Sequence, residues 1–477
     1  MRDSSTGPSS SGSSVGPSTS DHLSTGSSVG PSSSGPPSTP SACPLLAPTD
    51  PPPLLCSHPM QTQAQRGIFR PKQRLFVTQL SPGPPPLEPL TVSEARKYKE
   101  WDAALTAENS ALLANDPWEL VPRLPHYNVL GNRWVFRVKH HSDGSIERFK
   151  TRLVAKGFHQ RPGLDFTDTF TLVVKPVTVR TIFTLALTHG WSIAQFDVNN
   201  AFLQGPLEDE VYMVQPPGFV DPSRPHHVCR LKKAIYGLRQ APRAWYTTLC
   251  SFLQDFGFQK THFDASLFVY SRGRTLLYFL VYVNDLLLTG NDPAVLISFQ
   301  QALSHRFSLK ALGDVNYFLG IEIIPTATGF LLSQHKYMVD ILHRFLMMDA
   351  KSIDTPMAAS ATLTLDDGTT PADATRFLQA VCALQYLVYT RPDIAFYVNK
   401  LSQYMHAPTA HHWQCVKHLL RYISGTLTFG LSIRRSTTPL TLTAFAYSDW
   451  AGNPDDRSST TGYLVYLGAT LISWRSQ

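Results

Sequence analysis

The chain has 477 residues, of which 43% are hydrophobic and 16% charged, and its formal net charge is +7. This length suggests on the order of two to four folded units at roughly 150 residues each, and the apolar content excludes a chain that is disordered throughout. The low charged fraction and the 37 prolines indicate a non-globular part, and the positive charge is compatible with a polyanionic partner.

The cysteines and the apolar runs indicate a protein that is neither secreted nor membrane-bound. The six cysteines contain no Cys-x-x-Cys pair, which is typical of reduced thiols. The polar N-terminus does not resemble a signal peptide, and the most apolar run, 276–288, is too short to cross a bilayer. We therefore expect a soluble, intracellular protein of the cytoplasm or nucleus.

Residues 1–91 are expected to be a disordered tail and linker. Ser, Gly, Pro and Thr dominate its first part, where the hexapeptide SSVGPS occurs at 13–18 and again at 27–32. Such a segment buries too little apolar surface to offset its ordering entropy. The proline runs at 51–53 and 84–86 could dock a partner as polyproline helices, but a passive linker is the simpler interpretation.

A helix and a basic β-hairpin follow the tail. Apolar residues near a 3.6-residue period predict a helix from Ser93 to Asn115. Alternation in 132–139, a turn at 142–145 and a second run from Ile146 predict the hairpin. This region carries eight Lys and Arg between positions 131 and 161, against two acids. A solvated face is the usual interpretation, but positive charge on one side of a hairpin also suits phosphates.

Two separate acids stand beside apolar, strand-like runs. Asp197 lies in QFDVNNAFLQG (195–205), and Asp285 in LLYFLVYVNDLLLTG (276–290), where Val283-Asn284-Asp285 is typical of a tight hairpin. Either acid alone could be a turn or cap residue. Together they suggest two carboxylates on adjacent strand ends, which is the arrangement that holds paired Mg²⁺ ions for phosphoryl transfer.

From about Tyr98 to its C-terminus, the chain resembles the reverse transcriptase segment of a copia-type retrotransposon Pol polyprotein. The matching motifs are NDPWELVPR (115–123), WVFRVKHHSDGSIERFKTRLVAKGFHQ (134–160), VNNAFLQG (198–205), EVYMVQPPGF (210–219), LKKAIYGLRQAPRAWY (231–246), YVNDLLLTG (282–290), YFLGIEI (317–323), ALQYLVYTRPDIAF (383–396) and LRYISGT (420–426).

The resemblance implies an α+β, right-hand polymerase fold with fingers, palm and thumb around an antiparallel palm sheet flanked by helices. Residues 92–345 would form the fingers, the palm and the start of the thumb. Residues 346–440 would form the thumb or connection, and 441–477 a truncated ribonuclease H-like segment. The implied activity is RNA-directed DNA polymerisation on an RNA or DNA template-primer with deoxynucleoside triphosphates.

The resemblance also implies roles for individual residues. Asp197 and Asp285 would be catalytic, and with the Val198 carbonyl they would ligate Mg²⁺, with Mn²⁺ as a substitute. Phe202 would exclude a ribose 2′-hydroxyl, although it could equally be a core phenylalanine, and either Arg152 or Lys156 would hold the triphosphate. The remaining implied contacts are Tyr236, Gly237 and Gln240 beneath the templating base pair, and Leu319, Gly320 and Ile321 at the primer end.

Asn284 departs from the family pattern, which has two aspartates after Tyr-Val. An amide offers a carbonyl oxygen but no charge. A carboxylate about 4 Å from a divalent ion is worth roughly 8 kcal/mol at an effective dielectric of about 20. If half of this survives solvation, its loss slows the reaction about a thousandfold. We therefore expect an intact fold and a severely impaired polymerase.

The C-terminal motifs predict no further activity. Asp449, in a segment that resembles the start of a ribonuclease H domain, could match either of two family aspartates. The glutamate and second aspartate of such a site do not follow it before Gln477, so we expect no ribonuclease H activity. His411, His412, Cys415 and His418 suit one helix face better than a zinc site. Protease and integrase motifs are not found, and we expect neither part in this chain.

Three interpretations follow from the sequence. The first is a reverse transcriptase domain, impaired by Asn284. The second is a catalytically dead relic that binds nucleic acid through its basic hairpin. The third, an interaction protein that acts through its proline-rich tail, has the least support.

Overall fold

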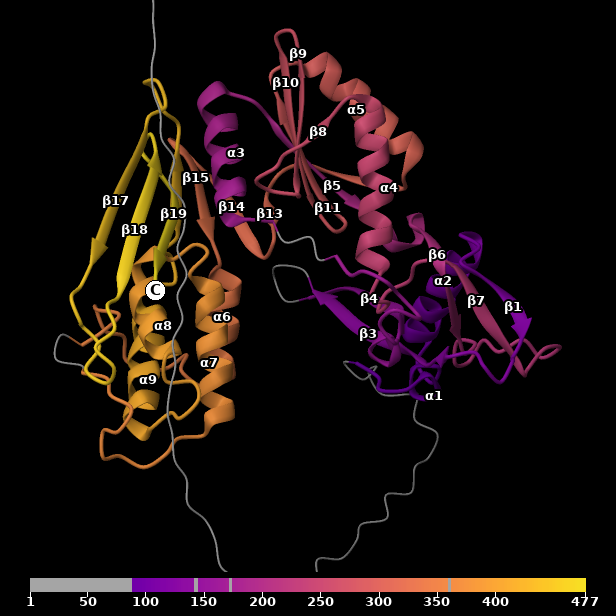
Figure 1. Ribbon diagram of the computed structural model, residues 1–477, viewed down its shortest axis with the longest axis horizontal. Helices are drawn as coiled ribbons and strands as arrows, with labels where there is room; N and C mark the ends of the chain where they lie inside the picture. Colours follow the sequence, from indigo (N-terminus) through magenta and orange to yellow (C-terminus); the bar gives the residue numbers. More distant parts are fainter. Residues whose placement is uncertain (1–87, 141–144, 171–173, 359–361) are drawn as a thin grey trace, which may run out of the picture. The chain divides into compact units, whose positions relative to one another are not determined.

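The computed structural model of the chain describes residues 88–140, 145–170, 174–358 and 362–477 (Figure 1). The N-terminal tail up to residue 87, with both of its proline runs, lies outside the described residues. Within these ranges, helices combine with sheets in which nearly all strand pairs are antiparallel. The prediction of a mixed α and β fold is therefore confirmed.

The single helix predicted for residues 93–115 is wrong, because the chain forms two helices there. These are α1 (Val92–Ala95) and α2 (Lys99–Ala114), and an extended backbone position separates them. The helix is interrupted at Tyr98, whose backbone is extended with φ −122° and ψ 125°. Arg96, which still has helical backbone angles, donates from its guanidinium to the Gly218 carbonyl at 2.6 Å.

The two paired strands of the predicted basic hairpin are confirmed, and the turn predicted at 142–145 lies outside the described residues except for Ser145. Its strands β3 (Asn132–His140) and β4 (Ile146–Ala155) pair antiparallel. Trp101 of α2 packs edge-on against Phe136 and Phe149 of the hairpin, with ring centroids 5.5 and 4.7 Å away. A four-stranded sheet of order β1-β7-β6-β2 shares this core. Its strands are β1 (Trp118–Pro122), β2 (Val129–Leu130), β6 (Pro206–Met213) and β7 (His227–Lys233).

A six-stranded antiparallel sheet of order β12-β5-β11-β10-β9-β8 positions the candidate site. Helices α4 (Ala241–Phe256) and α5 (Pro293–Arg306) lie along one face of it (Figure 1), and α3 (Pro176–His189) packs on the other. The strands are β5 (Ile193–Val198), β8 (Gln259–Lys260), β9 (Leu267–Arg272), β10 (Thr275–Tyr282), β11 (Asp285–Gly290) and β12 (Leu309–Asp314).

Alternating side chains along β5 and β11 divide the apolar core between the two faces. Phe196 and Leu286 pack in the cluster that contains Trp245 of α4. Leu287 packs in the cluster that contains Phe183 of α3. Because successive strand residues point to opposite faces, these apolar residues determine which polar residues face the α3 side.

A second four-stranded sheet and a helical bundle follow in the chain. The sheet has the order β13-β14-β15-β16, with strands β13 (Tyr317–Phe318), β14 (Ile321–Thr326), β15 (Gly329–Ser333) and β16 (Leu431–Arg434). Between β15 and β16 lie the helices of the bundle, which has its own apolar core. They are α6 (His335–Arg344), α7 (Ala374–Leu387), α8 (Ala395–Ser402) and α9 (Ala410–Gly425).

No helix in the described ranges has both the length and the apolar character that crossing a bilayer requires.

The last strands form a three-stranded antiparallel sheet of order β17-β18-β19. They are β17 (Leu442–Ser448), β18 (Thr461–Leu467) and β19 (Thr470–Ser476). Buried Arg180 of α3 attaches β19, because its guanidinium lies 3.7 Å from the Trp474 ring and donates to the Ile472 carbonyl at 3.0 Å. This segment therefore packs on the same helix that covers the six-stranded sheet.

Asp393 neutralises a buried cation of the helical bundle, so the loss of the Asp393 carboxylate should destabilise the fold. Arg391 is 1% exposed, and its guanidinium lies 2.7 Å from the Asp393 carboxylate. Asp393→Ala leaves this charge buried without its partner, so we expect the free energy of unfolding in urea to fall by about 3 kcal/mol. The matched control is Asp340→Ala, because exposed Asp340 forms no ion pair within the described ranges. A loss no larger than the control's would contradict this account.

Candidate active site

The candidate site begins with the pairing of β5 and β11. Asp197 is the cross-strand partner of Asp285, and the Val198 N–H donates to the Asn284 carbonyl at 2.9 Å. That flanking bond makes Asp197 and Asp285 a non-hydrogen-bonded pair, in which side chains lie closest and share one face. The two carboxylates therefore lie side by side.

These carboxylates belong to a row of polar side chains across the sheet. Both lie on the α3 face, since Asp285 is two residues from Leu287. On one side, Lys310 of β12 is the cross-strand partner of Asp197. On the other, Tyr282 of β10 is the partner of Asp285. The row therefore crosses four neighbouring strands.

A two-residue turn, Val283-Asn284, joins β10 to β11. Val283 has a φ of +52°, which β-branched residues rarely adopt. The Trp245 indole N–H of α4 donates to the Val283 carbonyl at 2.6 Å. The apolar core thus holds a strained turn directly beside the carboxylates, and such strain is common at functional sites.

The Asn284 amide lies between the two carboxylates. Its Nδ2 is 2.5 Å from Asp197 Oδ1 and 3.5 Å from Asp285 Oδ1. Burial, followed by the negative charge of Asp197, raises the pKa of Asp285 to about 6. The amide N–H groups offset part of the repulsion between the acids, because hydrogen bonds to a charged carboxylate favour that form.

The residues present fit a divalent cation, but with one charge fewer than a three-acid site would supply. Carboxylate oxygens are preferred ligands of Mg²⁺, and Asp197 and Asp285 offer them from neighbouring strands. The Val198 side chain is buried on the opposite face, so only its backbone carbonyl has suitable chemistry. In the described part of the chain, no group of three or more His, Cys, Asp or Glu could hold a metal.

A cavity of about 610 Å³ opens over the carboxylates. Its lining also includes four cations of the β3–β4 hairpin, namely Lys139, Arg148, Lys150 and Arg152. Burial and the neighbouring arginines lower the pKa of Lys150, which indicates positive charges held close together. A cationic wall that shares a cavity with two acids suits a phosphate chain whose end is bound through metal ions.

Lys156 does not line this cavity. It follows β4, and its backbone N–H donates to the Gly131 carbonyl at 2.8 Å. A Cβ on Gly131 would lie 3.1 Å from the Lys156 side chain, so the lysine stem runs along this glycine. Of the two residues that the sequence offers for the triphosphate, the structure places only Arg152 at the cavity.

Arg152 stacks on an aromatic pair. Its guanidinium lies 4.6 Å from the centre of the Tyr236 ring, and Tyr236 meets Phe202 edge-on with centroids 4.7 Å apart. Phe202, in the short helix η2 (Ala201–Gln204), is 9% exposed and is not part of the cavity lining. It packs as a core residue behind Tyr236.

The turn at Tyr236-Gly237 lies against the end of β4. The Ala155 N–H donates to the Tyr236 carbonyl at 2.8 Å. Gly237 has a φ of +93°, and a Cβ there would overlap the Ala155 carbonyl. Gly157, at the start of the short helix η1 (Gly157–His159), would likewise overlap the Gly237 carbonyl. These glycines are required because two backbones approach closely.

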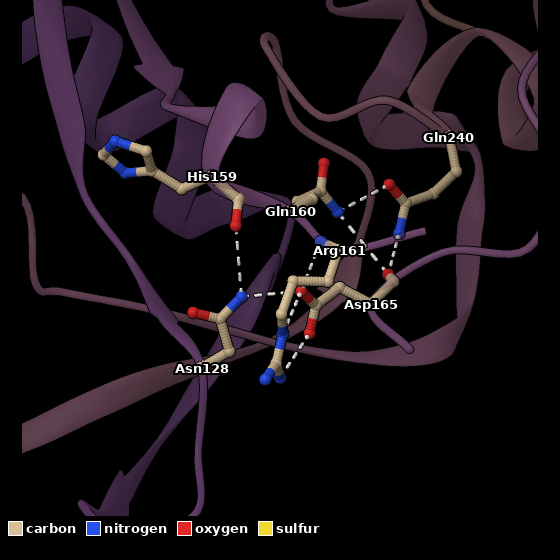
Figure 2. Close-up of polar contacts among 6 residues, drawn as sticks. All are labelled: Asn128, His159, Gln160, Arg161, Asp165 and Gln240. Atoms are coloured by element: carbon tan, nitrogen blue, oxygen red, sulfur yellow. Dashed lines mark hydrogen bonds and ion pairs between the residues drawn. The ribbon is translucent and has the colours of Figure 1, made fainter. Parts of the chain in front are cut away.

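A buried polar network supports the segment between the Tyr236-Gly237 turn and α4 (Figure 2). Gln240 is 4% exposed; it donates to the Asp165 carbonyl at 3.1 Å and accepts from Gln160 at 3.0 Å. Burial alone would raise the pKa of Asp165, but hydrogen bonds from Arg161 and Asn128 hold it below its usual value. Gln240 thus supports the loop and does not line the cavity.

The three residues predicted at the primer end do reach the cavity. Leu319, Gly320 and Ile321 lie at the turn between β13 and β14 and line the same space as Asp197 and Asp285. The structure therefore brings together segments that are far apart in the sequence.

Two other sequence candidates lie away from this cavity. Asp449 follows β17, accepts a hydrogen bond from the Thr460 N–H, and lines a separate hollow of about 310 Å³. His412 of α9 is fully buried, and its Nδ1 accepts the Thr409 N–H at 3.0 Å. The Thr409 hydroxyl in turn accepts a hydrogen bond from the backbone N–H of His412 at 3.3 Å, so Thr409 and His412 together cap the N-terminus of α9.

Sequence reasoning missed several residues that line the cavity, among them Gln195 and Tyr386. Gln195 shares its strand face with Asp197, so alternation alone could have identified it. Tyr386, from α7, had no local signal in the sequence.

Comparison with known proteins identifies the family. The family "Reverse transcriptase (RNA-dependent DNA polymerase)" matches residues 115–359. A retrovirus-related Pol polyprotein from transposon RE2 of Arabidopsis thaliana is 49% identical over 423 residues, covering 88% of this chain and 29% of that protein. One from transposon TNT 1-94 of Nicotiana tabacum is 36% identical over 408 residues, covering 82% and 30%.

A shorter relative is similar as well. A putative transposon Ty5-1 protein of Saccharomyces cerevisiae is 31% identical over 283 residues, which are 59% of this chain and 92% of that protein. The chain spans less than a third of the two Pol polyproteins, and the family match contains the carboxylate pair, the basic hairpin and the β13–β14 turn. The chain therefore belongs to the reverse transcriptase family, in the group formed by the Pol polyproteins of copia-type transposons.

Proposed function

We propose that this chain is a template-directed DNA polymerase that extends a primer on an RNA or DNA template with deoxynucleoside triphosphates. The observation that carries the proposal is the shared cavity, in which Asp197 and Asp285 lie with the cations of the β3–β4 hairpin. Phosphoryl transfer needs acidic metal ligands at the reacting phosphorus and positive charge along the leaving phosphates. Membership of the reverse transcriptase family supports the same activity.

In this proposal the chain is a right-hand polymerase. The β3–β4 hairpin serves as the fingers and the six-stranded sheet as the palm, so that residues 92–345 include both and the start of the thumb. Residues 346–440, which contain helices α7 to α9 of the bundle, serve as the thumb or connection, and α6, which shares their apolar core, belongs to the start of the thumb. Residues 441–477 would be a ribonuclease H-like segment.

Asp197 and Asp285, with the Val198 carbonyl, would hold the divalent cations, Mg²⁺ by preference and Mn²⁺ as a substitute. When bound, these ions supply charge stabilisation on the transferring phosphoryl group and activation of the primer 3′-hydroxyl. The chain's own residues orient the substrates. Leu319, Gly320 and Ile321 would contact the primer end.

Arg152 would hold the triphosphate, because its guanidinium lines the cavity and is fixed on the Tyr236 ring. Lys156 is the alternative donor, although its stem lies along Gly131. Phe202, whose ring meets Tyr236 edge-on, would exclude a ribose 2′-hydroxyl. Gly237 and Gln240 would shape the turn beneath the templating base pair.

Asn284 would impair this activity. A neutral amide stands beside Asp197 and Asp285, and its N–H groups point to their oxygens. A cation bound there must displace these hydrogen bonds and gains no third negative charge. Mg²⁺ requires near-octahedral ligation and loses its waters reluctantly, so a weak amide ligand would affect it more than Mn²⁺.

Restoring the acid should restore the activity. Asn284→Asp adds one negative charge at the carboxylate pair, and we expect primer extension in Mg²⁺ to rise at least about tenfold, equivalent to ~1.4 kcal/mol in the barrier. The measurement is single-nucleotide extension in Mg²⁺ and in Mn²⁺, and the unaltered chain should show its residual activity in Mn²⁺.

The control for this experiment is Asp197→Asn in the Asn284→Asp background, which should abolish extension again. Equal rates in Mg²⁺ for the unaltered chain and Asn284→Asp would show that Asp197 and Asp285 suffice. If neither protein extends a primer with either ion, the polymerase proposal is wrong.

The basic hairpin should determine the affinity for nucleic acid. Changing Arg148, Lys150 and Arg152 together to Glu should weaken primer–template binding at least about tenfold, equally for different sequences, and flatten its dependence on salt. Fluorescence anisotropy of a labelled duplex over a series of KCl concentrations measures both effects.

The matched control changes Lys97, Lys99 and Arg123 to Glu, so that the net charge changes by the same amount. These three residues are exposed and do not line the cavity. This triple variant should weaken binding much less. Equal losses for the two triple variants would mean that total charge alone, and not the hairpin surface, determines the affinity.

A further inference from the structure

We propose that Gln195 and Tyr386 are positioning residues that together hold the Leu319-Gly320 turn opposite Asp197, and so fix the place of the primer terminus. The inference rests on the proposed function, because it takes this turn as the primer contact. It assigns a role to two side chains that line the cavity from different elements, β5 and α7.

The turn has a strained backbone that needs support. Phe318 of β13 pairs with Ile321 of β14, and the two residues between them have positive φ values, +53° at Leu319 and +74° at Gly320. Two left-handed positions in a two-residue hairpin define a type I′ turn, which favours Asn and Gly. Leucine at the first position is disfavoured, so neighbouring contacts must hold it there.

Tyr386 provides the first contact. Its hydroxyl donates to the Leu319 carbonyl at 2.6 Å, and a Cβ at Gly320 would overlap this hydroxyl. Both central residues of the turn, Leu319 and Gly320, therefore lie against the hydroxyl oxygen of Tyr386. Burial raises the pKa of Tyr386 to about 12, so the hydroxyl remains a donor at neutral pH.

The Tyr386 ring is itself held in the helical bundle. It meets Tyr337 of α6 edge-on, with centroids 4.9 Å apart, and it lies 5.4 Å from the ring of Tyr389. Its hydroxyl is therefore a fixed point, and a movement of α7 relative to the sheets would be transmitted to the turn.

Gln195 provides the second contact, from β5, the strand that also carries Asp197. Its Nε2 donates to the Tyr317 carbonyl at 2.8 Å, and the residue is 4% exposed. Gln195 lies two residues before Asp197 in β5, so the two side chains share a face. Tyr317 is likewise two residues before Leu319, so the two contacts hold carbonyls on the same short segment.

These two side chains span a gap in the sheet structure. β5 and β13 belong to different sheets, and a backbone bond from the Val315 N–H to the Ile193 carbonyl at 3.0 Å joins them before β13 begins. Phe318 also packs in one apolar cluster with Ile193 of β5. Beyond these contacts, Gln195 and Tyr386 provide the side-chain hydrogen bonds to the segment that carries the turn.

The test is photo-crosslinking from the primer terminus, which needs no catalysis. The full chain is saturated with a primer–template duplex that carries 4-thiothymidine as its last primer nucleotide, and crosslinks to residues 317–321 are quantified. Tyr386→Phe and Gln195→Met should each lower this yield at least fivefold, while the Kd for the duplex changes less than twofold.

Matched controls lose the same groups elsewhere. Tyr337→Phe removes a hydroxyl from the same aromatic cluster, where it donates to the Ala383 carbonyl at 3.4 Å. Gln215→Met removes a buried amide that donates to the Arg224 carbonyl at 2.8 Å. Both controls should keep the parental crosslink yield, and thermal melting shows which variants are folded.

The outcomes separate this inference from the proposed function. If the parental chain does not bind the duplex, or binds it without crosslinks at 317–321, the proposed function or its primer contact is wrong and the inference fails with it. If the parental crosslink is present and Tyr386→Phe, the more conservative change, keeps it, only the inference is overturned.

A kinetic measurement in the Asn284→Asp background adds a second readout. Tyr386→Phe should lower the maximal rate of nucleotide addition about tenfold with little change in the half-saturating nucleotide concentration. Tyr337→Phe should change neither value. Equal effects of the two substitutions would overturn the positioning role.

Discussion

The position of the candidate site depends on the register between β5 and β11. Side chains alternate along a strand, so a slip of one residue would move Asp197 to the face that packs against α4 and α5. Phe196 and Leu286 prevent the slip, because they are 1% and 0% exposed and would have to exchange places with carboxylates. The burial of apolar side chains on one face therefore forces Asp197 and Asp285 together on the other.

Two neighbouring carboxylates destabilise the protein that holds them when no cation is bound. Burial and the charge of Asp197 raise the pKa of Asp285 to about 6, and a third acid would add to the same repulsion. Asn284 instead donates hydrogen bonds to both. It thus favours the folded, cation-free chain while weakening the proposed cation site, which is a trade-off between stability and activity.

Hairpins could be predicted from the sequence because alternation and turn residues are local signals. Asp285 followed from such a signal, whereas the role expected of Arg152 came from the family resemblance. The order of strands in the sheets could not be predicted. The extended backbone at Tyr98, which divides the predicted helix, also has no nearby Pro or Gly as a signal in the sequence. Excluding Lys156 from the cavity required knowing where β4 ends, and strand boundaries are poorly predicted. Tyr386 meets the cavity only through the packing of α7, which leaves no pattern in the sequence.

In the proposed polymerase, nucleic-acid binding and catalysis would depend on different numbers of groups in this cavity. Several cations line it, and each contributes only a share of the counterions released from a polyanion. The proposed cation site depends on Asp197 and Asp285, so a change beside them acts on the whole reaction. Asn284 leaves the apolar residues that fix the strand register untouched. Under the proposed function, substitutions of this kind would therefore remove nucleotidyl transfer before they remove nucleic-acid binding or the fold.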